Sequence, residues 1–179
     1  MNPAPNLYLV GYRATGKTSV GRALADVLGR DFVDADALLT AEAGEDVAGI
    51  VAREGWEGFR DRESAILARL SASRGLVVAT GGGVVTRPQN VEMLRATGIV
   101  VWLTASPAVI AARMGADVKT ASLRPSLTGA DVLDEIRSVL SAREPLYAGA
   151  AHFTVATDGK SVAHIRDLVL KETGESHAG

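Results

Sequence analysis

Residues 11–18 read Gly11-Tyr12-Arg13-Ala14-Thr15-Gly16-Lys17-Thr18 and match the pattern G-x-x-x-x-G-K-[ST] of a phosphate-binding loop. The apolar run Leu7-Tyr8-Leu9-Val10 before the loop predicts a strand. Residues 19–28 after it carry apolar side chains at helical spacing and predict a helix. Strand, glycine loop and helix, in this order, form the context that the pattern requires. The stretch therefore predicts a nucleotide-binding loop, in preference to a glycine-rich turn that carries Lys-Thr by chance.

The residue types of this loop suit a phosphate ligand. Gly11 and Gly16 permit turns that a Cβ atom hinders, so that consecutive N–H groups point into one concavity. The first turn of the next helix adds unpaired N–H donors and the positive end of its dipole. Lys17 can neutralise the β- and γ-phosphates, and the Thr18 hydroxyl can take one site on Mg²⁺.

Size and composition are those of one globular domain. The chain has 179 residues, 47% hydrophobic and 22% charged, so we expect a single domain over residues 1–179. A net charge of −2 gives no sign of a nucleic-acid surface, and the absence of cysteine excludes disulfides and thiolate metal sites. There is no signal-peptide pattern and no apolar run of roughly 18 residues, so we expect a cytoplasmic protein with no membrane contact.

Apolar runs and helical patterns alternate along the rest of the chain. Strands are predicted over 31–36, 76–79, 99–103 and 153–156, and helices over 37–43, 46–54, 60–73, 88–96, 107–114, 131–142 and 161–171. Residues 115–128 read as a polar loop, and residues 172–179 as a disordered tail. This alternation predicts an α/β fold with a central parallel sheet covered by helices on both faces, whose ligands collect at the carboxyl ends of the strands.

Two carboxylates stand at such an end, because Asp34 and Asp36 close the second predicted strand. In a functional interpretation, one belongs to the hydration shell of a metal and the other to a substrate hydroxyl. The alternative is a polar turn in which an Asp caps the next helix. The nearby phosphate loop favours the functional interpretation.

Other candidate site residues are charged residues on predicted helices and a run of three glycines. Arg60 and Glu63 are three residues apart on one helix face, as in many solvated pairs. Arg143 stands where we expect a helix to end, because Pro145 disfavours helix at the residue before it. Gly81-Gly82-Gly83 costs backbone entropy and suggests a tight turn or a close approach to a ligand.

The loop over residues 115–128 carries Lys119 and Arg124 and reads either as a mobile lid or as a long surface loop. A lid can bring an arginine onto a transferred phosphoryl group. His152, His164 and His177 show no metal-ligand spacing, and Trp102 reads as core.

Taken together, these residues resemble the shikimate kinases, a family of small-molecule kinases with a P-loop NTPase-like, three-layer fold. The resemblance covers residues 6–170 and is carried by six motifs in the family's order. They are Gly11–Thr18, Val33-Asp34-Ala35-Asp36, Gly58-Phe59-Arg60 with Glu63, Thr80-Gly81-Gly82-Gly83, Leu123-Arg124-Pro125 and Arg143-Glu144-Pro145-Leu146-Tyr147.

The resemblance implies phosphorylation of the 3-hydroxyl of shikimate by MgATP, in the aromatic amino-acid pathway, by a monomer. It implies that Lys17, Asp36 and Arg124 are catalytic and that Thr18 and Asp34 hold Mg²⁺. Nucleotide binding would fall to Gly11, Arg13, Ala14, Thr15, Gly16, Lys17, Thr18, Ser19, Arg113 and Arg124. Shikimate would be bound by Asp36, Arg60, Glu63, Gly81, Gly82, Gly83 and Arg143, largely from a helical segment over residues 37–66.

The sequence departs from the family pattern in three places. Trp56 stands where the family usually has Glu, and the segment from Arg113 to Arg124 is longer and continues Arg-Pro-Ser-Leu rather than Arg-Pro-Leu-Leu. The stretch Val155-Ala156-Thr157-Asp158 lacks the proline that often follows it. We expect altered kinetic constants rather than lost activity. Two alternatives remain, a P-loop kinase for another small hydroxy-acid or sugar acid and a non-catalytic nucleotide-binding relative.

Overall fold

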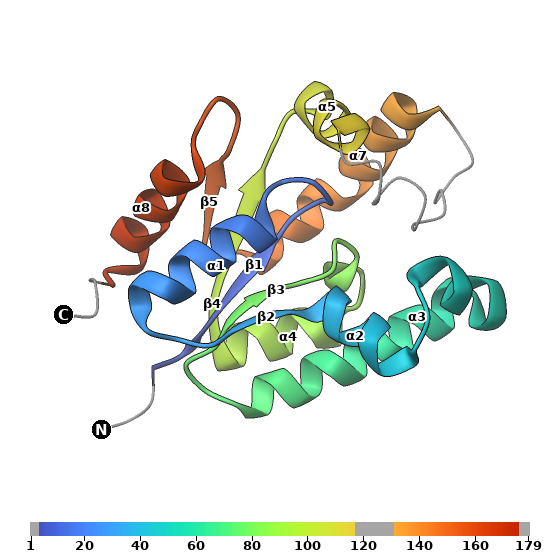
Figure 1. Ribbon diagram of the computed structural model, residues 1–179, viewed down its shortest axis with the longest axis horizontal. Helices are drawn as coiled ribbons and strands as arrows, with labels where there is room; N and C mark the ends of the chain where they lie inside the picture. The colour runs from blue at the N-terminus through green and yellow to red at the C-terminus, as the bar shows by residue number, and fades with distance from the viewer. Residues whose placement is uncertain (1–3, 117–130, 176–179) are drawn as a thin grey trace.

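The computed structural model describes residues 4–116 and 131–175, which form a parallel five-stranded sheet in the order β2-β3-β1-β4-β5 (Figure 1). The strands are β1 (Asn6–Val10), β2 (Phe32–Asp34), β3 (Val77–Ala79), β4 (Gly98–Thr104) and β5 (Phe153–Ala156). The helices are α1 (Lys17–Leu28), α2 (Ala35–Ala43), α3 (Val47–Ala72), the 3₁₀ turn η1 (Val84–Thr86), α4 (Pro88–Thr97), α5 (Pro107–Ala116), α7 (Val132–Ala150) and α8 (Val162–Thr173).

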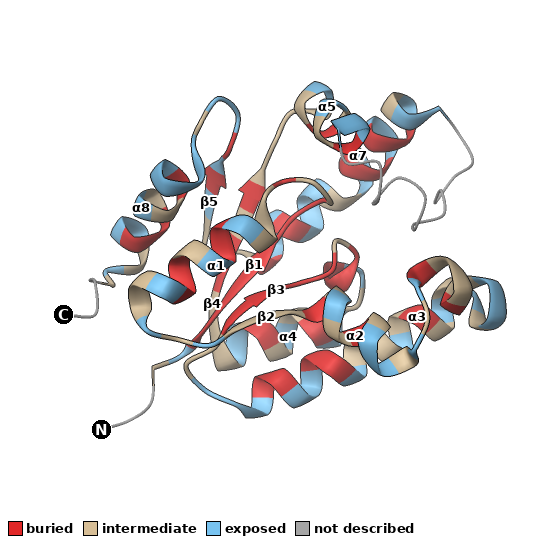
Figure 2. Ribbon diagram, viewed as in Figure 1, coloured by how far each residue is buried: buried red, intermediate tan, exposed pale blue. Residues whose placement is uncertain are grey.

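Helices cover both faces of the sheet, as the alternation along the sequence predicts (Figure 1). Alternate residues of β1 enter different cores, because successive side chains of a strand point to opposite faces. Tyr8 and Val10 pack with α3, α4 and α7, whereas Leu7 and Leu9 pack with α1 and α8. The central strands β1 and β3 are buried between these layers (Figure 2), which explains their nearly continuous apolar runs.

The predicted strands and helices are present, with differences at their ends. The second strand stops at Asp34, and Asp36 lies in the first turn of α2 instead of at the strand end. The side chain of Asp34 caps α2 by accepting a hydrogen bond from the N–H of Ala37 at 3.0 Å. Helix α3 joins two predicted helices across a break at Gly55, whose φ of 71° and ψ of 176° are not helical. Helix α8 continues to Thr173, beyond the predicted end at 171.

The prediction that a helix ends near Arg143 is wrong. Helix α7 continues through Pro145 to Ala150. A proline inside a helix costs about 3 kcal/mol, because it removes one N–H donor and crowds the preceding turn. Beyond the proline, Tyr147 and Ala150 are fully buried, and their packing offsets this cost.

The carboxyl ends of β1, β2 and β3 lie at one edge of the sheet, because these strands are parallel and in register. The phosphate loop, the turn between β2 and α2, and the glycine turn at residues 81–83 therefore meet at this edge. None of the helices described by the structure is both long and apolar enough to span a bilayer.

Candidate active site

The phosphate loop has the backbone that its glycines predict. Gly11 has a φ of 145°, and a Cβ atom there would lie 2.4 Å from the carbonyl oxygen of Leu103. Gly16 caps α1 in a left-handed conformation, with a φ of 94°. Within the described residues, Ala14 alone combines a side chain with a positive φ, of 60°. This strain at Ala14 is of the kind that clusters at ligand-binding loops.

Lys17, Thr18 and Asp34 meet at the amino end of α1. The ammonium of Lys17 donates to the carbonyl oxygens of Gly11 and Tyr12, both at 2.8 Å, so it lies within the curve of the loop. The hydroxyl of Thr18 donates to Oδ2 of Asp34 at 2.6 Å. The sequence-predicted metal-binding pair is thus brought together, while the other oxygen of Asp34 caps α2.

A large cleft opens along this loop, and we call it the phosphate cleft. It is lined by Arg13–Val20, Asp34, Asp36, Ala79, Thr80, Arg113, Met114, Lys160, Val162 and Ile165. Arg113 donates to the carbonyl of Ala14 at 3.0 Å and to the hydroxyl of Thr157 at 3.3 Å. Sequence reasoning missed Lys160 and the α8 residues Val162 and Ile165 in the wall of the cleft. The turn Gly159-Lys160-Ser161 comes after the carboxyl end of β5, and this position could have indicated that it lies at the ligand-binding edge of the sheet.

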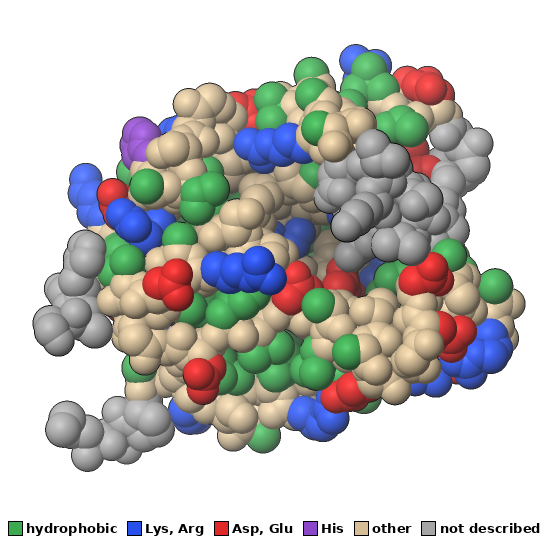
Figure 3. Space-filling model, viewed as in Figure 1, with side chains coloured by type: hydrophobic (Ala, Val, Ile, Leu, Met, Phe, Trp, Pro, Cys, Tyr) green, Lys and Arg blue, Asp and Glu red, His purple; other side chains and the backbone are tan. Residues whose placement is uncertain are grey.

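A second, smaller pocket, which we call the arginine pocket, adjoins the cleft. It is lined by Tyr12, Arg13, Asp36, Val47, Trp56, Phe59, Arg60, Glu63, Gly82, Gly83 and Arg143. Arg13 and Asp36 line both spaces and mark the junction between them. Figure 3 shows a hollow in the middle of this face, with basic and acidic side chains on its walls.

Arg60 is held on several sides within the arginine pocket. Its guanidinium donates to Oε2 of Glu63 at 2.8 Å and lies 5.6 and 5.3 Å from the ring centres of Trp56 and Phe59. A Cβ atom on Gly83 would lie 2.1 Å from Cζ of Arg60. The arginine therefore packs against bare backbone, which explains one glycine of the triplet.

Glu63 is buried, and its Oε1 has no hydrogen-bond partner among the described residues. Burial raises the pKa of this carboxyl above its usual value, and the neighbouring Arg60 opposes the shift. A Cβ atom on Gly81 would lie 2.3 Å from Oε1 of Glu63 and 2.7 Å from Oδ1 of Asp36. Gly81 thus makes room for two carboxylates, as Gly83 makes room for a guanidinium.

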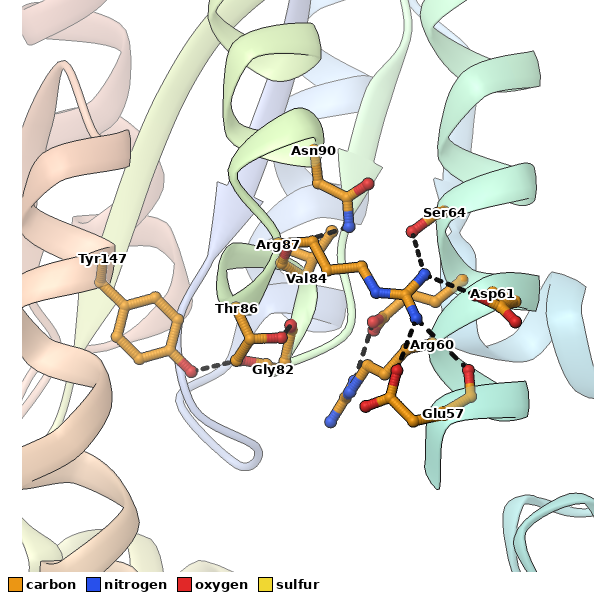
Figure 4. Close-up of polar contacts among 12 residues, drawn as sticks. Glu57, Arg60, Asp61, Ser64, Gly82, Val84, Thr86, Arg87, Asn90 and Tyr147 are labelled. Carbon is orange, nitrogen blue, oxygen red and sulfur yellow. Dashed lines mark hydrogen bonds and ion pairs between the residues drawn. The ribbon is translucent and has the colours of Figure 1, made fainter. Parts of the chain in front are cut away.

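Helix α7 contributes Arg143 to the wall of the pocket, and Tyr147 follows Arg143 by one turn. The hydroxyl of Tyr147 donates to the carbonyl oxygen of Gly82 (Figure 4), and its ring stacks on Trp102 with centroids 5.6 Å apart. Burial raises the pKa of Tyr147 to about 12, so the hydroxyl remains a donor at neutral pH. The role of Tyr147 in fixing the glycine turn depends on the continuation of α7 past Pro145, which the sequence did not predict.

Arg13 has a buried partner outside the loop. It pairs with Oε1 of Glu135 at 3.0 Å, and the carboxylate side chain is 3% exposed. Because Glu135 lies in the first turn of α7, this pair joins the phosphate loop to the helix that carries Arg143.

Some predicted residues fall outside the site or outside the structure. Lys119 and Arg124, with most of the predicted lid, lie outside the described residues, and residues 115–116 end helix α5.

His152 lies at the sheet and not in the site. Its Nδ1 accepts a hydrogen bond from the N–H of Val100 at 3.0 Å, and burial lowers the pKa of this imidazole. Among the described residues, no three His, Cys, Asp or Glu side chains gather into a metal-binding group.

Comparisons with known proteins agree with this geometry. A family model described as "Shikimate kinase" matches residues 13–173. The shikimate kinase of Symbiobacterium thermophilum is 48% identical over 95% of this chain and 98% of its own. That of Nitratidesulfovibrio vulgaris is 46% identical over 90% of this chain and 92% of its own. A solved structure, "Shikimate kinase from Acinetobacter baumannii in complex with shikimate", has a TM-score of 0.89 at 36% identity and covers 95% of this chain and 93% of that one.

The family match over residues 13–173 includes most of the phosphate loop, the glycine turn and the arginines of α3 and α7, and each relative is covered almost completely. The chain belongs to the shikimate kinase family, and it is an ATP-dependent small-molecule kinase.

Proposed function

We propose that this protein transfers the γ-phosphoryl group of MgATP to the 3-hydroxyl of shikimate, giving shikimate 3-phosphate and ADP, in the route to chorismate and the aromatic amino acids. The observation that carries the proposal is the junction of two spaces, a phosphate cleft and an arginine pocket that share Arg13 and Asp36. A reaction between two bound substrates needs such a junction.

The arginine pocket suits a small ring that bears one carboxylate. Arg60 and Arg143 supply two planar guanidinium forks, which match a carboxylate better than an ammonium group does. Trp56 and Phe59 supply an apolar wall for the ring. Because Glu63 already engages one nitrogen of Arg60, it holds the fork in place while other donors remain for the substrate.

Asp36 is proposed to accept the proton of the attacking hydroxyl. In the transfer, that hydroxyl oxygen forms a bond to the γ-phosphorus, and the bond from the γ-phosphorus to the bridging oxygen of ADP breaks. Asp36 lines both spaces, so it lies where the two substrates would meet. Phosphoryl transfer depends on positioning and charge neutralisation, for which we propose Lys17 and, from the predicted lid, Arg124.

Thr18 and Asp34 are proposed to hold Mg²⁺, directly or through water. Their oxygens lie 2.6 Å apart beside the phosphate loop, and oxygen ligands suit this ion. Mg²⁺ in such sites usually keeps several waters and substrate phosphate oxygens as ligands, so one or two protein oxygens suffice to hold it. Bound Mg²⁺ would neutralise charge on the phosphates. We propose that the protein acts as a monomer.

A coupled assay of ADP release over a panel of sugars, gluconate, nucleotides and shikimate tests this function. We expect a selective response to shikimate that requires Mg²⁺. Turnover of another acid in preference to shikimate would contradict the substrate assignment. Binding of ATP with no turnover of any substrate would contradict the proposed reaction.

A further inference from the structure

Arg87, which no role assigned above uses, lies just after η1 and connects the glycine turn to helix α3 (Figure 4). Its guanidinium contacts Oδ1 of Asp61 at 2.8 Å and Oε2 of Glu57 at 3.0 Å. Weaker contacts reach the hydroxyl of Ser64 at 3.3 Å and the carbonyl oxygen of Glu57 at 3.4 Å. The three α3 residues follow one another at helical spacing, so Arg87 lies along one face of α3.

The segment that connects Arg87 to the arginine pocket is short and internally bonded. The N–H of Val84 donates to Gly81 at 3.2 Å, and the hydroxyl of Thr86 donates to Gly83 at 2.7 Å. The buried Asn90 donates to the carbonyl oxygen of Val84 at 3.0 Å. These hydrogen bonds tie the residues before Arg87 to the glycine turn, so they link the contacts of Arg87 with α3 to that turn.

Helix α3 is fixed near its other end by a buried residue of β1. The side-chain amide of Asn6 donates to the carbonyl oxygens of Ser73 at 2.9 Å and Leu70 at 3.3 Å. The break at Gly55 divides α3 into two parts. A Cβ atom built on Gly55 would meet nothing within 4 Å, so among the described residues no neighbouring segment packs against this point. Glu57 comes two residues after this break, so Arg87 anchors α3 at the end that Asn6 does not hold.

We propose that Arg87 is a positioning residue for the substrate arginine Arg60. Arg60 lies on α3 between Glu57 and Asp61, and its guanidinium packs against Gly83 with no space for a Cβ atom. The gap between α3 and the glycine turn therefore sets where Arg60 points in the arginine pocket. Arg87 holds that gap through side chains that take no part in the pocket itself. The expected change in the KM for shikimate rests on the proposed function, whereas the anchoring of α3 by Arg87 does not.

Steady-state kinetics of Arg87→Gln test the proposal. We expect the KM for shikimate to rise about threefold to tenfold, because the contacts are partly exposed and each such pair is worth little. The KM for ATP should stay within about twofold, because the phosphate loop does not contact Arg87. Arg87→Lys, which keeps the charge, should restore part of the lost affinity.

A matched control is Arg69→Gln, which removes another exposed ion pair of α3, with Glu42 at 2.7 Å. We expect no change in either KM for this variant. Should Arg87→Gln fail to fold, Asp61→Asn replaces it, because the Asp61 side chain is 72% exposed and its loss does not endanger the core. That variant should raise the KM for shikimate in the same direction.

Hydrogen exchange of the amides of residues 57–64 gives a readout that needs no substrate. Arg87→Gln should exchange faster there than the wild type and Arg69→Gln. Unchanged exchange would overturn the proposal. Faster exchange with an unchanged KM for shikimate, or with equal rises in both KM values, would reduce Arg87 to a structural residue and also overturn it. If the wild type does not phosphorylate shikimate, the proposed function fails, and exchange still decides whether Arg87 anchors α3.

Discussion

The phosphate cleft and the arginine pocket share an edge of the sheet but are built in opposite ways. The contiguous residues 13–20 form the largest single part of the wall of the cleft, and their groups are loop backbone, one arginine, one lysine and three hydroxyls. The wall of the pocket comes from α2, α3, the glycine turn and α7, together with Tyr12 and Arg13 of the phosphate loop, and these segments lie far apart in the sequence. Local sequence determines most of the phosphate cleft, whereas tertiary packing determines the arginine pocket. Substitutions should therefore affect ATP binding and shikimate binding separately.

Lys17→Ala should give the largest effect and act on the cleft alone. Removing a cation from the site of phosphoryl transfer should lower kcat by about 10²–10³-fold, with shikimate binding little changed. Rapid-quench or coupled kinetics with calorimetric binding of each ligand measure this. Lys171→Ala, in the last turn of α8, is the matched control and should keep its rate. Near-normal turnover of the Lys17 variant would contradict the phosphate-loop role.

Arg60→Ala should act on the pocket alone. Loss of one partner of a charge-assisted pair should weaken shikimate binding by about 1.5–3 kcal/mol and leave ATP affinity nearly unchanged. Calorimetry with each ligand separately measures both affinities. The variant should also lose thermal stability, because it leaves the buried Glu63 without its cation. An equal loss of both affinities would remove the distinction between cleft and pocket.

Gly83→Ala should give a smaller effect of the same kind, because it displaces Arg60 without removing it. The new Cβ atom would start 2.1 Å from Cζ of Arg60, the end of a side chain that can shift. We expect a rise of about tenfold in the KM for shikimate. Gly149→Ala is the control, because a Cβ atom there meets nothing within 4 Å. An unchanged KM for Gly83→Ala would show that the pocket does not depend on this packing.

The sequence predicts the cleft better than the pocket, because the cleft is built largely from one contiguous stretch and the pocket from distant segments. Gly11, Gly16, Lys17 and Thr18 carry their meaning in one short pattern, and the strands and helices around them follow from periodicity. The sheet and its layers were therefore predictable, and so was the meeting of Asp34 with Thr18 at one edge. The family resemblance then named the arginines of the pocket.

What the sequence did not predict depends on contacts between distant segments. Pro145 predicted a helix end near Arg143, but α7 continues to Ala150. The burial of Tyr147 and Ala150 beyond the proline stabilises the helix against this local preference. The pair of Arg13 with Glu135 joins residues 122 positions apart, which no spacing reveals. Likewise, nothing in the sequence shows that Gly81 and Gly83 face Glu63 and Arg60, because that depends on how α3 packs against the turn.

Helix α7 contacts the phosphate loop through the pair of Glu135 with Arg13, and it contributes Arg143 to the arginine pocket. Further along the same helix, Tyr147 bonds to the glycine turn. If a ligand shifts this helix, the shift is passed to the other site through the pair of Arg13 with Glu135. By thermodynamic linkage, ATP would then alter the affinity for the acid by the same factor by which the acid alters the affinity for ATP. The helix would then couple the binding of the two ligands before any bond between them is made.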